Sequence, residues 1–140
     1  MALGQLVNGK WVKNWTERDE KGEFQRMSTK FHHQITKDAS SGFKPEPGRY
    51  HLYISLGCPM AHRTIIMRQL NELNDVIGLS IVDPVISEEG WKFSQKEGCI
   101  LDTVNDMKYL REIYTLADSN YTGRVTVPVL WDKKTQTIVN

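Results

Sequence analysis

HLYISLGCPMAHR, residues 51–63, is the stretch that decides the fold of this chain. Apolar residues alternate with others over residues 51–56, which predicts a β-strand with one apolar face. Gly57 ends this strand, and Pro59 suits the first turn of a helix, where a missing backbone N–H costs nothing. A strand therefore passes directly into a helix, with Cys58 at the junction.

The residues that follow extend this strand and helix into a βαβ unit. The helix is expected to continue to Leu73, with an apolar stripe at Ile66, Leu70 and Leu73. Residues 79–82 are mostly apolar and predict a second strand. The spacing between the two strands is long enough for a right-handed crossover, so they are expected to be parallel.

The C-terminal third adds a helix and a hairpin. Asp102 or Thr103 is expected to cap a helix that ends near Ala117. Residues 127–131 predict a strand, and a short polar turn joins them to a partner strand at residues 137–139. The order of elements is βαβ, α, ββ, which indicates the α/β class.

Residues 1–47 have a different character from the rest of the chain. They are polar, and their apolar residues are scattered without a helical or strand period. Pro45, Pro47 and Gly48 then mark a turn region. We expect an irregular N-terminal arm over residues 1–47, with aromatic side chains that dock on a domain formed by residues 48–140.

Composition narrows the classes of function. The 140 residues contain 39% hydrophobic and 25% charged residues, which is ordinary for a soluble globular protein with one domain. The net charge of +1 gives no reason to expect binding to nucleic acid or to an anionic membrane. No apolar run reaches the roughly 20 residues that span a bilayer, and residues 1–10 lack the apolar core of a signal peptide. The expected location is therefore cytoplasmic.

Cys58 is the candidate for chemistry. A thiol at the start of a helix faces unpaired backbone N–H groups and the positive end of the helix dipole, and His62 and Arg63 add positive charge one turn later. These features favour the thiolate, which attacks disulfides and thioethers. The alternative is that Cys58 is a small residue packed under the loop.

Cys99 and His62 do not extend this site. Cys99 follows Gly98 in a predicted loop, so we expect two free thiols rather than a disulfide. His62 shares a helix face with Cys58, but two ligands without a third are weak grounds for a metal site. No metal is expected.

Pro128 stands at the head of a predicted strand, where its missing N–H removes a ladder hydrogen bond. A cis Val127-Pro128 bond, with the Val127 backbone beside Cys58, would account for this position. An ordinary trans proline at the strand entry is the alternative. Trp91 can be a core aromatic residue or the wall of a ligand pocket, and composition does not choose between the two.

Three stretches together resemble one family. They are residues 58–64, 90–93 and 123–132. The first resembles Cys-Pro-Trp-Ala-His-Arg-Thr, the signature of the xi-class glutathione transferases, which are the glutathionyl-hydroquinone reductases. Met60 stands where the family has Trp. In the arm, Gly22, Phe24, Arg26 and Ser28 also resemble the family, with a departure in spacing.

The resemblance implies a thioredoxin-like domain and a reductase that removes glutathione from glutathionyl-hydroquinones. Cys58 would be the catalytic nucleophile and would form a mixed disulfide with glutathione, the co-substrate. The residues implied to bind glutathione are Trp91, Arg124, Val127 and Pro128. Full-length members of the family are implied to be homodimers.

The resemblance also implies that this chain is the front part of a longer enzyme. In the family, a Glu-Ser pair that holds the γ-glutamyl group follows the position of Asn140, and a helical C-terminal domain supplies the hydroquinone pocket. We therefore expect weak activity, or none, from this chain alone. Two other functions stay open: a glutaredoxin-like enzyme that removes glutathione from proteins, and a glutathione-binding module without turnover.

Overall fold

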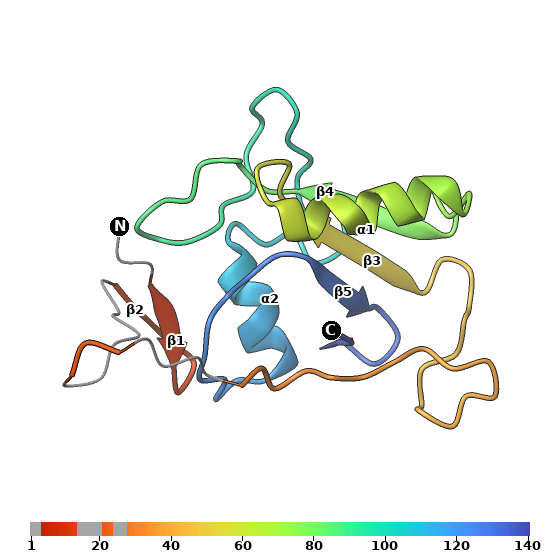
Figure 1. Ribbon diagram of the computed structural model, residues 1–140, viewed down its shortest axis with the longest axis horizontal. Coiled ribbons are helices and arrows are strands. Elements are labelled where there is room, and N and C mark those ends of the chain that lie inside the picture. Colours follow the sequence, from red (N-terminus) through yellow and green to blue (C-terminus); the bar gives the residue numbers. More distant parts are fainter. Residues whose placement is uncertain (1–3, 14–20, 24–27) are drawn as a thin grey trace.

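A four-stranded mixed sheet is the centre of the molecule (Figure 1). The computed structural model describes residues 4–13, 21–23 and 28–140. The strands are β3 (Tyr50–Ile54), β4 (Ile77–Ile81), β5 (Val129–Asp132) and β6 (Thr137–Ile138), in the order β4-β3-β5-β6. β3 and β4 are parallel, whereas β3 with β5 and β5 with β6 are antiparallel.

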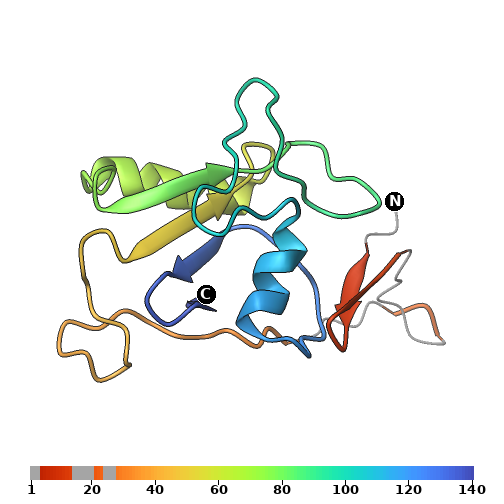
Figure 2. The same cartoon turned by 180° about the vertical axis from the view of Figure 1, so that it is seen from behind.

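Helices α1 (Pro59–Leu70) and α2 (Leu110–Ala117) cover opposite faces of this sheet. Figure 1 shows α1 in front of the sheet, and Figure 2, the view from behind, shows α2 uncovered. The predicted order of elements is confirmed. Because both faces are covered, all of β3 is buried, rather than one face as its alternation predicted. Within the described residues, no helix is long and apolar enough to span a membrane.

The predicted apolar stripe of α1 does not face the core. Ile66 is 45% exposed and Leu70 is 73% exposed. The helix instead turns Ala61 towards the sheet, where this small residue is fully buried. Beside the exposed side of α1 runs an apolar groove of about 810 Å³, with Leu52, Met67 and Leu130 among its lining residues.

The second helix begins later than predicted, at Leu110 instead of directly after a cap at Asp102 or Thr103. Asp102 does act as a cap, but its carboxylate accepts the backbone N–H groups of Val104, Asn105 and Met107, which closes a turn instead of starting a helix. The helix starts only at Leu110, after the Glu112 carboxylate has accepted a hydrogen bond from the Tyr109 backbone.

The arm contains a hairpin where the sequence predicted irregular structure. Strands β1 (Gln5–Val7) and β2 (Lys10–Val12) pair in antiparallel fashion across Asn8 and Gly9, which both have positive φ. Asn-Gly is a strong signal for this tight turn, because both residues tolerate the left-handed conformation. Residues 28–49 contain no helix or strand, as expected.

Two aromatic side chains of the arm, Phe31 and Phe43, dock on the domain, as the sequence predicted for the aromatic residues of the arm. Phe31 is buried and stacks on Tyr121, with ring centroids 5.7 Å apart, and Phe43 is buried in a second small cluster with Tyr50. The family-like pattern at Phe24 and Arg26 lies outside the described residues.

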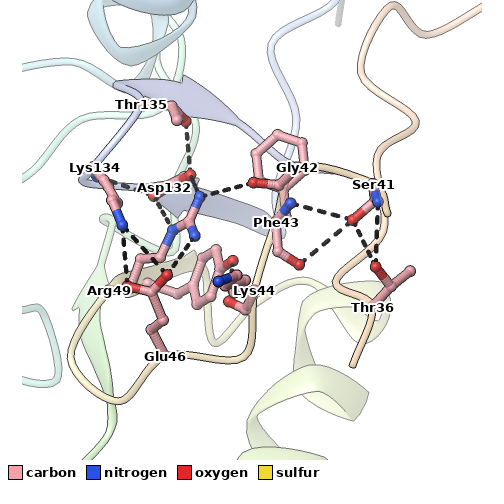
Figure 3. A network of polar contacts seen from close by, with 11 residues as sticks. Thr36, Ser41, Gly42, Phe43, Lys44, Glu46, Arg49, Asp132, Lys134 and Thr135 are labelled. Atoms are coloured by element: carbon pink, nitrogen blue, oxygen red, sulfur yellow. Dashed lines mark hydrogen bonds and ion pairs between the residues drawn. The ribbon is translucent and has the colours of Figure 1, made fainter. Parts of the chain in front are cut away.

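A buried ion pair joins the end of the arm region to the β5–β6 hairpin (Figure 3). The Arg49 guanidinium donates two hydrogen bonds to the Asp132 carboxylate, at 2.9 and 2.6 Å. Thr135 and the Lys134 backbone also donate to this carboxylate, and Glu46 accepts a hydrogen bond from Arg49 at 3.0 Å. Burial raises the pKa of Asp132, but these hydrogen bonds outweigh it and hold the value at about 2.

Candidate functional site

Cys58 lies at the junction that the sequence predicted. It is the residue before α1, with extended backbone (φ −106°, ψ 115°), and Pro59 opens the helix. The Cys58 carbonyl accepts the N–H of His62 at 3.0 Å, so the first turn begins at the cysteine itself. Its side chain is half-buried and therefore open to a ligand. His62 and Arg63, the predicted sources of positive charge, are both exposed.

The Val127 backbone stands beside this thiol. The Val127-Pro128 bond is cis, and the Cys58 Sγ lies 3.7 Å from the Val127 carbonyl oxygen. The predicted cis bond and the predicted position of the Val127 backbone beside Cys58 are both confirmed. These residues are 69 positions apart in the sequence, so the fold brings together the thiol and a backbone segment that can bind an extended peptide.

Arg124 lies in the loop that leads to Pro128. The two residues line a cavity of about 170 Å³, together with Ser28 and Thr29 from the arm and Asn140. Two tyrosine hydroxyl groups fix the backbone of this loop. Tyr121 donates to the Arg124 carbonyl at 3.0 Å, and Tyr114 of α2 donates to the Thr126 carbonyl at 3.0 Å.

Trp91 lies in a different loop, between β4 and α2. Its side chain is half-buried and packs on the main core cluster, which Cys58 also borders. The Trp91 carbonyl accepts the N–H of Leu110, so the start of α2 fixes its backbone. Trp91 is thus both a core neighbour and a partly accessible ring.

The other candidates lie apart from this arrangement. Cys58 and Cys99 are both free, as predicted, and Cys99 follows the turn at Gly98. Met60 follows Cys58 by two residues, and its side chain is 53% exposed. Among the residues that the structure describes, no group of three or more His, Cys, Asp or Glu side chains could hold a metal ion.

Sequence reasoning missed the hairpin at the edge of this site. The available signal was the turn pair Asn8-Gly9 between Leu6-Val7 and Lys10-Trp11.

Comparison with known proteins gives a consistent result. No family model matches the chain. Glutathionyl-hydroquinone reductase YqjG of Escherichia coli is 44% identical over 99% of this chain, and glutathionyl-hydroquinone reductase PcpF of Sphingobium chlorophenolicum is 40% identical over 99%. The chain spans 44% and 43% of the length of these two relatives.

Solved structures point the same way. The xi-class glutathione transferase of Natrialba magadii superposes with a TM-score of 0.87 and is 46% identical, over 99% of this chain and 41% of its own. The glutathione-bound structure of E. coli YqjG superposes with a TM-score of 0.82 and is 42% identical, over 98% of this chain and 41% of its own. The chain therefore belongs with the xi-class glutathione transferases, the family of the glutathionyl-hydroquinone reductases, and it matches the part of them that carries the thioredoxin-like domain.

Proposed function

We propose that this chain binds glutathione and acts in the reductive removal of glutathione from glutathionyl-hydroquinones. The observation that carries the proposal is the 3.7 Å approach of the Cys58 thiol to the Val127 carbonyl, at the open end of α1. A tripeptide that pairs with the Val127 backbone would have its own sulfur beside that thiol.

The other residues have supporting roles in this proposal. Arg124 supplies a guanidinium for a carboxylate of glutathione, a pairing that can use two parallel hydrogen bonds. Trp91 offers a ring face to the peptide, and Pro128 fixes the approach to β5. Glutathione is therefore the co-substrate, and the reaction as proposed needs no metal.

The proposed reaction has two displacements at sulfur. The Cys58 thiolate attacks the glutathione sulfur of the conjugate, a disulfide bond forms, and the carbon–sulfur bond breaks. The hydroquinone carbon leaves with the electron pair and takes up a proton from solvent. A second glutathione thiolate then attacks the mixed disulfide and releases glutathione disulfide and the Cys58 thiolate. The hydroquinone carbon is reduced by two electrons, one from the sulfur of each of the two glutathione molecules that end as the disulfide.

The test uses the chain with a glutathionyl-hydroquinone and then with glutathione. Free hydroquinone should be released, and a mass spectrum of the intermediate should show one glutathionyl group on Cys58. Cys58→Ser should abolish both signals, while Cys99→Ser, the matched control, should keep them. The E. coli reductase serves as the positive control, and slower turnover is expected from this chain.

Two further substrates separate the alternatives. Release of glutathione from a glutathionylated peptide, without release of hydroquinone, would favour a glutaredoxin-like enzyme. Binding of glutathione without either reaction would favour a binding module. Hydroquinone release that survives Cys58→Ser would contradict the proposed nucleophile.

A further inference from the structure

We infer that the β1–β2 hairpin positions the two loops that carry Trp91 and Arg124, with Trp11 as its principal positioning residue. The inference rests on the proposed glutathione site, and it concerns residues that the site itself does not include. The hairpin contacts one loop through β1 and its turn, and it contacts the other loop through β2.

The first contact is with residues 119–123, directly before Arg124. Leu6 and Gly123 exchange two backbone hydrogen bonds, at 3.0 and 2.9 Å, and thus form a short antiparallel bridge. Gly9 donates to the Tyr121 carbonyl at 2.9 Å, and the Asn8 N–H donates to the Thr122 hydroxyl at 2.8 Å. The approach is so close that a Cβ on Gly9 would lie 2.0 Å from the Ser119 carbonyl oxygen.

The second contact is with residues 87–90, directly before Trp91. The Trp11 indole N–H donates to the Glu88 carbonyl at 3.0 Å. Its ring covers Gly90, where an added Cβ would lie 3.0 Å from the ring and where φ is +84°. Leu6 pairs with Trp11 across the hairpin, so the two contacts are made by neighbouring residues of one two-stranded unit.

Charged side chains also lie near Trp11 and near the loop that it contacts. The Arg111 guanidinium of α2 lies over the Trp11 ring, 5.2 Å from its centroid, and also binds the Glu89 carboxylate at 2.9 Å. Lys13 forms an ion pair with the same carboxylate. Lys13 is half exposed, so its ion pair contributes little, and the packing and hydrogen bond of Trp11 dominate the second contact.

One hairpin that holds both loops fixes their separation. Gly90 adjoins Trp91 and Gly123 adjoins Arg124, so a shift of either contact reaches a proposed glutathione contact within one residue. Misplacement of a binding group by about 1 Å can cost up to about 100-fold in activity. The alternative is that the hairpin only covers apolar surface. In that case its loss would lower the stability of the fold and leave the affinity for glutathione unchanged.

The experiment compares Trp11→Ala, Trp11→Phe and Val12→Ala with the unmodified chain. Val12 is the matched control, because it lies on the same strand but its side chain is exposed. Trp11→Ala is expected to raise the Kd for glutathione about tenfold or more. Trp11→Phe keeps a ring on Gly90 but loses the indole N–H, so its Kd should lie between the two. Val12→Ala should bind like the unmodified chain.

Hydrogen exchange supplies a second measurement that does not depend on glutathione. In Trp11→Ala, the Gly90 and Gly123 amides should exchange faster together, while the β3 amides keep their protection. In turnover of a glutathionyl-hydroquinone, KM should rise with little change in kcat, because Cys58 is not touched.

Unchanged affinity in a folded Trp11→Ala chain would overturn the positioning role while leaving the proposed function intact. Faster exchange at Gly90 alone would also overturn it, because the hairpin would then not couple the two loops. Failure of the unmodified chain to bind glutathione would instead refute the proposed function.

Discussion

At the scale of single residues, the proposed chemistry rests on Cys58 and Val127. Cys58 is the residue directly before α1, its side chain makes no capping hydrogen bond, and the Val127 carbonyl oxygen lies 3.7 Å from its sulfur. Cys99 has neither feature, since it follows the turn at Gly98 in a loop. The two free cysteines of one chain therefore serve as a matched pair.

We expect Cys58 to react faster than Cys99 with a small alkylating reagent at neutral pH. Attack requires a thiolate, and negative charge is favoured in general at the start of a helix. Cys58 lies at such a position and Cys99 does not. The rate for each cysteine can be followed by mass spectrometry of peptides over a range of pH. Two identical rate profiles would contradict an activated thiol.

His51 controls a different property, the dependence of stability on pH. Its ring is buried, with Nε2 2.8 Å from the Ser80 hydroxyl, and burial lowers the pKa of His51 to about 4. In the unfolded chain the value is about 6.5. Between these values the unfolded state binds a proton that the folded state excludes, so stability must fall as pH decreases from about 6.5 to 4.

The free energy of unfolding is therefore expected to decrease by as much as about 3 kcal/mol over that interval. His51→Gln should flatten the curve, and His62→Gln, an exposed control, should not. Urea unfolding at several pH values measures this slope. A wild-type curve that is already flat between pH 6.5 and 4 would show that His51 titrates normally in the fold.

At the scale of elements, the sequence predicted the junctions beside the proposed site and missed the β1–β2 hairpin, the start of α2 and the face that α1 turns to the core. The strand-to-helix junction at Cys58 and the strand entry at Pro128 carry their own signals, and both were found. The predicted start of α2 was wrong, because the Asp102 carboxylate binds the backbone N–H groups that would otherwise begin a helix. The Tyr53 hydroxyl also donates a hydrogen bond to this carboxylate. The predicted orientation of α1 was wrong because the prediction placed the large apolar residues Ile66 and Leu70 against the sheet, whereas the small residue Ala61 lies there.

The Arg49–Asp132 ion pair joins residues 83 positions apart, so no local pattern could reveal it. Asp132→Asn would leave the buried guanidinium with an incomplete set of acceptors, and we expect a loss of about 3 kcal/mol in the free energy of unfolding. Glu46→Gln removes a partly exposed partner of the same Arg49, and its cost should be clearly smaller than that of Asp132→Asn.

Denaturant unfolding at pH 7 checks this pair of variants, and equal losses in the free energy of unfolding would contradict a buried anchor.

The contribution of Asp132 to stability depends on pH with a definite sign. Since the pKa of Asp132 is held at about 2, below the ordinary value of about 3.9, its contribution is complete above pH 4 and is lost as pH falls towards 2.

At the scale of the whole molecule, the two faces of the central sheet have different surroundings. α2 and the arm bury one face and fix the loops with Trp91 and Arg124, whereas α1 leaves exposed apolar side chains beside the groove on the other. The relatives that match this chain are more than twice as long. Strands β3 to β6, both helices and the five residues of the proposed glutathione site all lie within residues 50–140.

An NMR titration with S-methylglutathione, which cannot form a disulfide, tests the proposed glutathione site directly. We expect the largest chemical-shift changes at the Cys58 and Val127 amides and at the Trp91 indole, with smaller changes along the apolar groove. The Cys58→Ser chain should show the same pattern, because binding does not require the thiol. Changes confined to the groove beside α1, or no changes at all, would contradict a glutathione site at Cys58 and Val127.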